Sequence, residues 1–181
     1  MRVSMLCLLL ALVAVHAFAD QVIEARNLRL TLPDGFSEPV QENLPSGGVL
    51  FKSDAVKLGL IVSVLVTKRS EYPDTLSTPS GVLLGIKESL VGDGRILREE
   101  EFVKDGYCGL RVYLAGDDGV FTRWEAIFVR PYAYLLGIAA RYEVALTGSL
   151  AKKIVNALAI APKGGKADAC DSTDFSERER N

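Results

Sequence analysis

The sequence predicts one α+β domain in which an antiparallel β-sheet is flanked by helices on both faces. Residues 107–142 read as three consecutive strands, and a glycine-rich turn separates the first two. Residues 58–66 and 135–140 are apolar at nearly every position, which is typical of strands covered on both faces. Residues 78–91 and 147–158 carry apolar side chains at helical spacing, so each is predicted to form a helix that packs on the sheet.

The Gly-Asp-Asp-Gly turn at residues 116–119 sets the register of the central hairpin. A three-residue loop of Asp117, Asp118 and Gly119 uses the left-handed conformation that glycine adopts at low cost. The pairs predicted from this loop are Leu114 with Thr122, Val112 with Trp124, Leu110 with Ala126, Cys108 with Phe128, Tyr113 with Arg123 and Arg111 with Glu125. A two-residue loop would place charged side chains among the apolar ones, so the three-residue register is favoured.

Four more strands are predicted, over residues 27–36, 49–51, 57–67 and 95–104. The first alternates leucines with polar residues and ends in a Pro-Asp-Gly turn. A bend at Ser53 and Asp54 is expected to join the second strand to the third. The run Glu99-Glu100-Glu101 in the last strand is predicted to form a solvated sheet edge, because neighbouring side chains on a strand point to opposite faces.

Two helices are expected beside the sheet. Thr78 is predicted to cap the first, with Pro79 at its first position and Gly92 after its end. Thr147 is predicted to cap the second. The residues expected to share one face of that helix are Leu150, Ile154, Ala157 and Leu158.

The amino-terminal residues have the layout of a secretory signal peptide. Arg2 precedes an apolar run at residues 5–15, and Ala17-Phe18-Ala19 supplies a small-x-small cleavage site. The run is short for a membrane span, and an uncleaved anchor is the alternative. We therefore expect cleavage after Ala19 and a periplasmic or secreted protein without stable membrane insertion. The predicted organisation is a signal peptide at residues 1–19, a folded domain at residues 20–161 and a disordered polar tail at residues 162–181.

Charge and histidine content exclude several functions. The chain has 21 basic and 23 acidic side chains, and loss of Arg2 would leave 20 against 23, a formal charge near −3. A mildly acidic chain without a basic run argues against nucleic-acid binding. The single histidine, His16, lies in the predicted leader, so the mature chain would lack the usual general base and a common zinc ligand. Nucleotide and calcium motifs are also missing, so we predict no catalytic residue, metal ligand or cofactor.

Two pairs of residues could carry chemistry. Ser149 and Lys152 match the S-x-x-K spacing of a lysine-activated serine, but the companion motifs are missing and the serine is better explained as a helix cap. Cys108 and Cys170 are the only cysteines outside the leader, so an oxidising compartment could join them in a disulfide. The alternative is a buried Cys108 and a free thiol in the tail.

The polar face of the three-strand meander is the candidate binding surface, for a protein partner or an anion. Its predicted members are Arg111, Tyr113, Arg123, Glu125 and Arg141. A three-residue loop at residues 131–133 would place Arg141 opposite Arg123, and two facing arginines repel unless an anion or an acidic partner offsets them. The alternative is a solvated face whose guanidinium groups point into water.

The element order, with Thr-Leu-Pro-Asp-Gly-Phe at residues 31–36 after the first strand, resembles the PsbP-like superfamily over residues 22–161. That superfamily includes the extrinsic lumenal protein of photosystem II, bacterial DcrB-type envelope proteins and a nuclear Ran-binding factor. The resemblance implies an α/β/α sandwich that acts as a protein-binding module and not as an enzyme. No photosystem-specific site carries over, and fold alone does not supply function.

These observations favour an exported, non-enzymatic binding or assembly factor of the cell envelope with an unidentified protein partner. Two alternatives stay open. One is a small-ligand carrier with a pocket between the sheet and the helix at residues 78–91. The other is a hydrolase that uses Ser149 and Lys152, or carboxylates.

Overall fold

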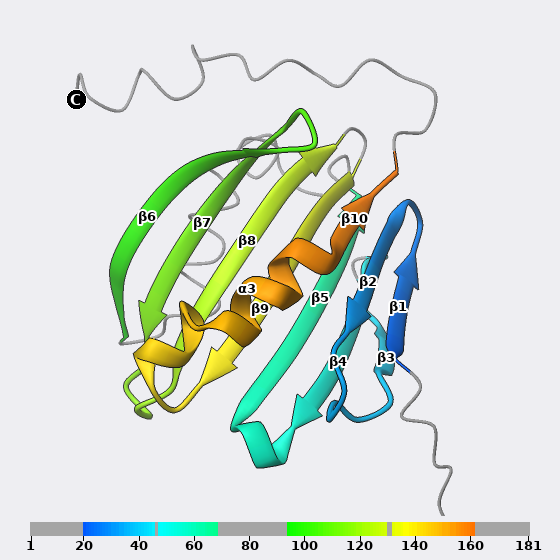
Figure 1. The fold of residues 1–181 in the computed structure, drawn as a ribbon. Coiled ribbons are helices and arrows are strands. Elements are labelled where there is room, and N and C mark those ends of the chain that lie inside the picture. Colours follow the sequence, from blue (N-terminus) through cyan, green and yellow to red (C-terminus); the bar gives the residue numbers. More distant parts are fainter. Residues whose placement is uncertain (1–19, 46, 69–93, 130–131, 162–181) are drawn as a thin grey trace, which may run out of the picture.

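A computed structural model describes residues 20–45, 47–68, 94–129 and 132–161, which form two antiparallel sheets and one α-helix (Figure 1). The large sheet has the order β3 (Val40–Asn43), β4 (Val49–Ala55), β5 (Leu60–Lys68), β9 (Tyr132–Ala140), β8 (Phe121–Val129), β7 (Tyr107–Ala115) and β6 (Arg95–Lys104). The small sheet has the order β1 (Gln21–Ala25), β2 (Leu28–Leu32) and β10 (Leu158–Ile160). All of these strands lie within the predicted domain of residues 20–161.

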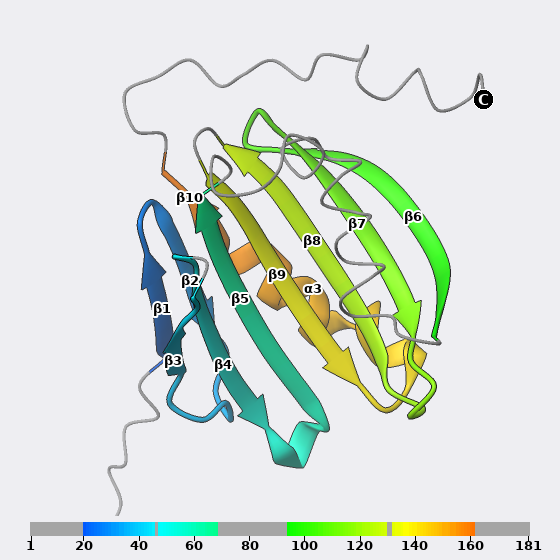
Figure 2. The same cartoon turned by 180° about the vertical axis from the view of Figure 1, so that it is seen from behind.

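The small sheet and α3 (Ser149–Ala157) cover one face of the large sheet, as the two opposite views show (Figures 1 and 2). The main core lies between these layers. Its fully buried members include Leu30 and Leu32 from β2, Val62 and Val64 from β5, and Ile154 from α3. Two 3-10 turns, η1 (Val56–Leu58) and η5 (Glu143–Leu146), close one end of the molecule.

The opposite face of the large sheet carries a second buried cluster, made of Leu110, Val112, Leu114, Ala126, Ala133 and Leu135. The helix predicted over residues 78–91 lies outside the described residues. Within the described ranges, α3 is the one α-helix, so helices on both faces are not supported. The second layer on the α3 side is built partly from a small sheet that the sequence analysis did not predict.

The central hairpin has the predicted register. Leu114 pairs with Thr122, Val112 with Trp124 and Arg111 with Glu125. Gly119 has φ +75°, the left-handed conformation expected for the loop, and the Gly116 N–H donates to the Val120 carbonyl at 2.8 Å. The edge strand β6 also matches its predicted bounds.

The turn between β8 and β9 was predicted wrongly. Tyr132 and Ala133 already belong to β9, and Arg123 pairs with Ile138 instead of Arg141. This register buries Tyr134, Leu136 and Ile138 in the main core, whereas a shift of three residues would turn them to the other face. Arg141 lies beyond the end of β9 and is exposed.

Two other local predictions were also wrong. Ser53 and Asp54 do not form a bend, because the Ser53 hydroxyl donates to the Ser37 carbonyl at 2.7 Å and the Asp54 N–H donates to the Ser37 hydroxyl at 3.0 Å within a continuous β4. The chain turns later, at η1. Thr147 does not cap α3: the cap position is Gly148, and the Thr147 hydroxyl donates to the Val144 carbonyl.

Candidate functional site: a charged groove beside α3

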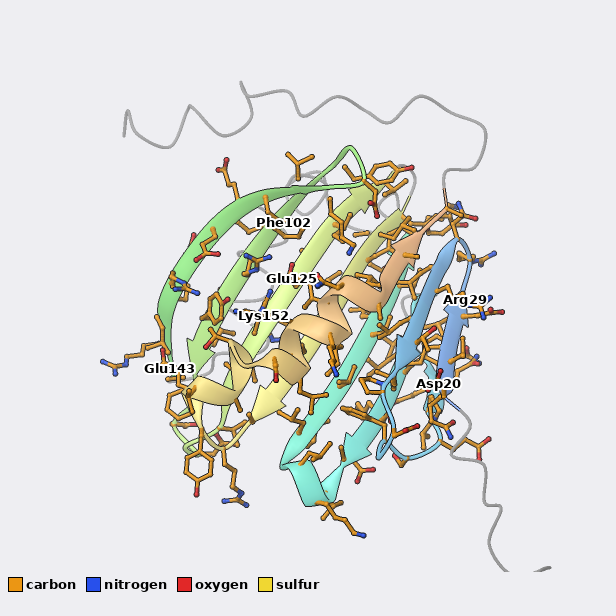
Figure 3. All side chains as sticks on the ribbon, viewed as in Figure 1. Asp20, Arg29, Phe102, Glu125, Glu143 and Lys152 are labelled. Carbon is orange, nitrogen blue, oxygen red and sulfur yellow. The ribbon has the colours of Figure 1, made fainter. Side chains whose placement is uncertain are left out.

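A groove of about 390 Å³ runs between α3 and strands β6, β7 and β8; we call it the α3 groove. Its lining residues are Arg98, Glu100, Arg111, Tyr113, Arg123, Thr147, Lys152, Val155 and Asn156. Figure 3 shows Glu125 on the sheet beneath the helix and Lys152 on the helix above it. The groove therefore lies over the face that the sequence analysis selected.

Strand pairing arranges the sheet side of the groove in two rows. Arg98, Tyr113 and Arg123 face one another across β6, β7 and β8. Glu100, Arg111 and Glu125 form the next row along the same strands. Cross-strand neighbours on one face lie close enough to interact, so the two rows place positive and negative groups side by side.

Glu125 is the centre of the charged floor. Its side chain is 1% exposed, and its carboxylate accepts hydrogen bonds from Arg111 Nε at 2.6 Å and from Arg123 Nε at 2.8 Å. Arg123 also donates to the Leu146 carbonyl at 3.0 Å, which ties the sheet to η5. A buried charge is tolerated only when it is paired and hydrogen-bonded, and this network meets that condition.

Arg111 connects the buried floor to the outer part of the groove. It donates to Glu125 and also to Glu100 Oε2 at 2.9 Å, and its side chain is 22% exposed. Burial alone would lower the pKa of Arg111, but its hydrogen bonds and charge interaction with Glu125, together with the hydrogen bond to Glu100, raise it overall. The positive charge of Arg111 is therefore permanent.

The outer wall and the helix wall each supply a further cation. Arg98 is half exposed, donates to Glu100 Oε1 at 2.7 Å through Nε and lies over the Tyr113 ring at 4.2 Å. Lys152 and Asn156 are exposed and one helical turn apart on α3. Four cationic and two anionic side chains line or floor the groove (Arg98, Arg111, Arg123 and Lys152; Glu100 and Glu125), a formal excess of two positive charges.

The other end of the helix is held to the sheet edge. Lys104, at the end of β6, donates to the Val155 carbonyl at 3.0 Å. This contact satisfies a carbonyl in the last turn of α3, where a positive charge also interacts favourably with the helix dipole. The helix wall of the groove is therefore fixed relative to its sheet wall.

The structure brings together four of the five residues predicted for the patch: Arg111, Tyr113, Arg123 and Glu125. They do not form a solvated face, because Arg123 and Tyr113 are both 5% exposed beneath α3 and η5. Arg98 was missed because the register shifts between Ile96 and Arg98. Strict alternation from Ile96 would place Arg98 and Glu100 on the same face as Ile96, opposite the groove. The shift turns both side chains to the groove side instead.

The other chemical predictions have different outcomes. Ser149 is exposed and does not line the groove, whereas Lys152 does. The run at residues 99–101 lies on the edge strand β6 as predicted, but Glu100 is not a solvated side chain, because it lines the groove and pairs with Arg98 and Arg111. Cys170 and the Cys108 side chain lie outside the described part of the structure, so their disulfide stays a prediction. The described residues contain no group of three or more His, Cys, Asp and Glu that could hold a metal ion.

Fold and groove together define an antiparallel α+β protein with a built-in charged recess. No family model and no curated protein matches the sequence. The fold is similar to the solution structure of cyanobacterial PsbP (CyanoP) from Synechocystis sp. PCC 6803, with a TM-score of 0.57, 14% identity, and coverage of 82% of this chain and 96% of that one. A Pseudomonas aeruginosa protein of unknown function, PA94, gives a TM-score of 0.47 and 12% identity, with coverage of 80% and 99%.

The fold is therefore PsbP-like, as the sequence resemblance predicted. Identities this low define the fold and leave the function to the residues of this chain. Among the described residues, no helix has both the length and the apolar composition needed to cross a bilayer.

Proposed function

We propose that this protein is an exported, non-enzymatic binding factor whose α3 groove receives an acidic segment of a partner protein. The observation that carries the proposal is the excess of two positive charges in a groove whose floor is already neutralised. Glu125 and Glu100 are used by Arg111, Arg123 and Arg98. Among the described residues, Lys152 has no carboxylate partner, and its ammonium is placed to meet one from outside.

The geometry favours a carboxylate over an apolar ligand. Arg98 lines the groove and uses Nε for Glu100. An arginine edge and an ammonium on opposite walls can bind the two oxygens of one carboxylate with charge-assisted hydrogen bonds. The rigid floor removes much of the ordering cost of binding, because Arg111 and Arg123 are already held in place.

A labelled oligoglutamate peptide provides a defined probe for the chain that begins at Asp20. The double variant Arg98→Glu/Lys152→Glu is expected to lower the affinity at least about tenfold, because it reverses the charge of the outer-wall cation and of the helix-wall cation. Arg95→Glu/Lys153→Glu makes the same change in net charge on β6 and α3 at exposed positions outside the groove. This control is expected to change affinity less than about threefold.

Three results would contradict the proposal. Wild type could fail to bind the peptide, both double variants could weaken binding equally, or binding could be insensitive to salt. An equal effect would mean that net charge, and not the groove, attracts the probe.

A photocrosslinker at Asn156 is expected to capture the natural partner in the source organism. Lys153, which does not line the groove, is the matched control position.

A further inference from the structure

Exposed apolar side chains are concentrated at one end of the molecule, around η1 and η5. The described residues contain eight exposed large apolar side chains, and five of them lie on or beside η1 and η5: Val56, Leu58, Ile61, Tyr142 and Val144. Val56 is 82% exposed, Val144 76% and Tyr142 74%. We call this surface the apolar end. Apolar side chains gathered this densely usually mark an interaction surface.

The apolar end is built on two anchored turns. Gly59 closes η1 with φ +64° and donates its N–H to the Val56 carbonyl at 3.1 Å. In η5, Leu146 is fully buried, and the Ala145 N–H donates to the Tyr142 carbonyl at 3.0 Å. The exposed side chains are therefore presented by a fixed backbone. Between the two turns lies a hollow of about 530 Å³ lined mainly by apolar residues.

The charged residues around this surface are mostly acidic. Lys57 and Arg141 are exposed beside it, as are five acidic residues: Asp34, Asp54, Asp117, Asp118 and Glu143. Two positive and five negative groups give a formal charge of −3. Long-range attraction therefore does not bring an anionic partner here, and a partner that binds is held by apolar contact.

The position of the amino terminus indicates what this partner is. Asp20 lies toward the same end of the molecule as η1, whereas β10 leaves at the opposite end (Figures 1 and 3). The residues that precede Asp20 include the apolar run at residues 5–15. A membrane that receives this run would therefore lie on the side of the domain where the apolar end is.

We propose that the apolar end rests on the surface of a lipid bilayer. Valine and leucine side chains would enter the acyl boundary, the Tyr142 phenol would lie at the headgroup level, and Lys57 and Arg141 would extend toward the aqueous side. A bilayer needs no complementary shape, so it can cover side chains that protrude as far as Val56 and Val144. The contact is reversible, because a few side chains bury less apolar surface than an acyl anchor.

Vesicle flotation tests this proposal with the chain that begins at Asp20, so that the apolar run itself cannot bind lipid. Wild type is expected to float with phosphatidylcholine vesicles at low and high salt, and at low salt less well with vesicles containing about one third phosphatidylglycerol, because anionic lipid repels the acidic residues. Val56→Asp/Val144→Asp is expected to lower the ratio of bound to free protein at least about tenfold. Val40→Asp/Val103→Asp is the matched control, since these valines are 69% and 65% exposed elsewhere.

Each other outcome overturns the proposal. If wild type stays in solution, or if both double variants lose vesicle binding equally, the apolar end does not contact lipid. Binding that needs anionic lipid and disappears with salt would assign the contact to charge. A dimer in light scattering that Val56→Asp/Val144→Asp converts to monomer would make this end an interface between copies. Unfolding midpoints within about 3 °C of wild type confirm that the exposed substitutions leave the fold intact.

Discussion

Glu125→Ala tests the charged floor of the α3 groove most directly. The carboxylate is 1% exposed and pairs with both Arg111 and Arg123. Its removal leaves the Arg123 guanidinium, 6% exposed, with the Leu146 carbonyl as its remaining described hydrogen-bond partner. Breaking a buried ion pair by removing one member costs about 3–5 kcal/mol, because the other charge stays desolvated.

Arg111 limits this loss. It is partly exposed and keeps its contact with Glu100, so water and a second carboxylate still stabilise its charge. We therefore expect the lower end of the range, about 3 kcal/mol in the free energy of unfolding. In a domain of this size that corresponds to a fall in Tm of about 6–12 °C.

Urea unfolding followed by the fluorescence of Trp124, the single tryptophan, measures this change. Glu101→Ala, on the exposed edge strand, is the control and is expected to stay within about 0.5 kcal/mol of wild type. Arg123→Leu/Glu125→Leu removes both members of the pair and is expected to cost less than Glu125→Ala alone. A loss below about 1 kcal/mol for Glu125→Ala would show that water reaches the floor and would refute the reasoning.

Three further predictions concern the core and the amino terminus. Burial raises the pKa of Tyr134 above its ordinary value of 10.0, so the folded state keeps this proton when the unfolded chain has lost it. Stability should therefore be full below about pH 10 and fall above it, and Tyr134→Phe should flatten that fall in alkaline unfolding curves. A Cβ on Gly137 would lie 2.7 Å from the Trp124 ring, so Gly137→Ala should cost about 1–3 kcal/mol and change tryptophan emission, while unchanged emission would mean that the ring has room to move. The exported protein should begin at Asp20 by intact mass, and a product that begins at Met1 would rule out the predicted cleavage.

The strongest sequence patterns predicted the centre of the sheet. Period-two alternation and the turn at residues 116–119 specify the β7–β8 register, because every slip by one residue would bury charge. The β8–β9 turn has no such signal. Apolar and aromatic residues lie on both sides of it, and its register depends on burying Tyr134, Leu136 and Ile138 in the main core. That is a tertiary effect which local pattern does not contain.

The sheet side of the groove could be predicted from the sequence, but the helix side could not. Residues on β7 and β8 share a face once the hairpin register is known, so Arg111, Tyr113, Arg123 and Glu125 could be grouped from sequence. Lys152 joins them only after α3 docks. The small sheet was missed because β10 is three residues long and directly follows a helix, so it is too short to show a strand pattern.

The pairing of β2 with β10 joins the beginning of the domain to its end. A nascent chain cannot complete this sheet until nearly its whole length is available, and contacts this distant in sequence form slowly. The small sheet therefore stays incomplete while the carboxyl-terminal part is still being synthesised. In the exported protein that we propose, late completion of this sheet would help to keep the chain unfolded until it has passed a narrow translocation channel.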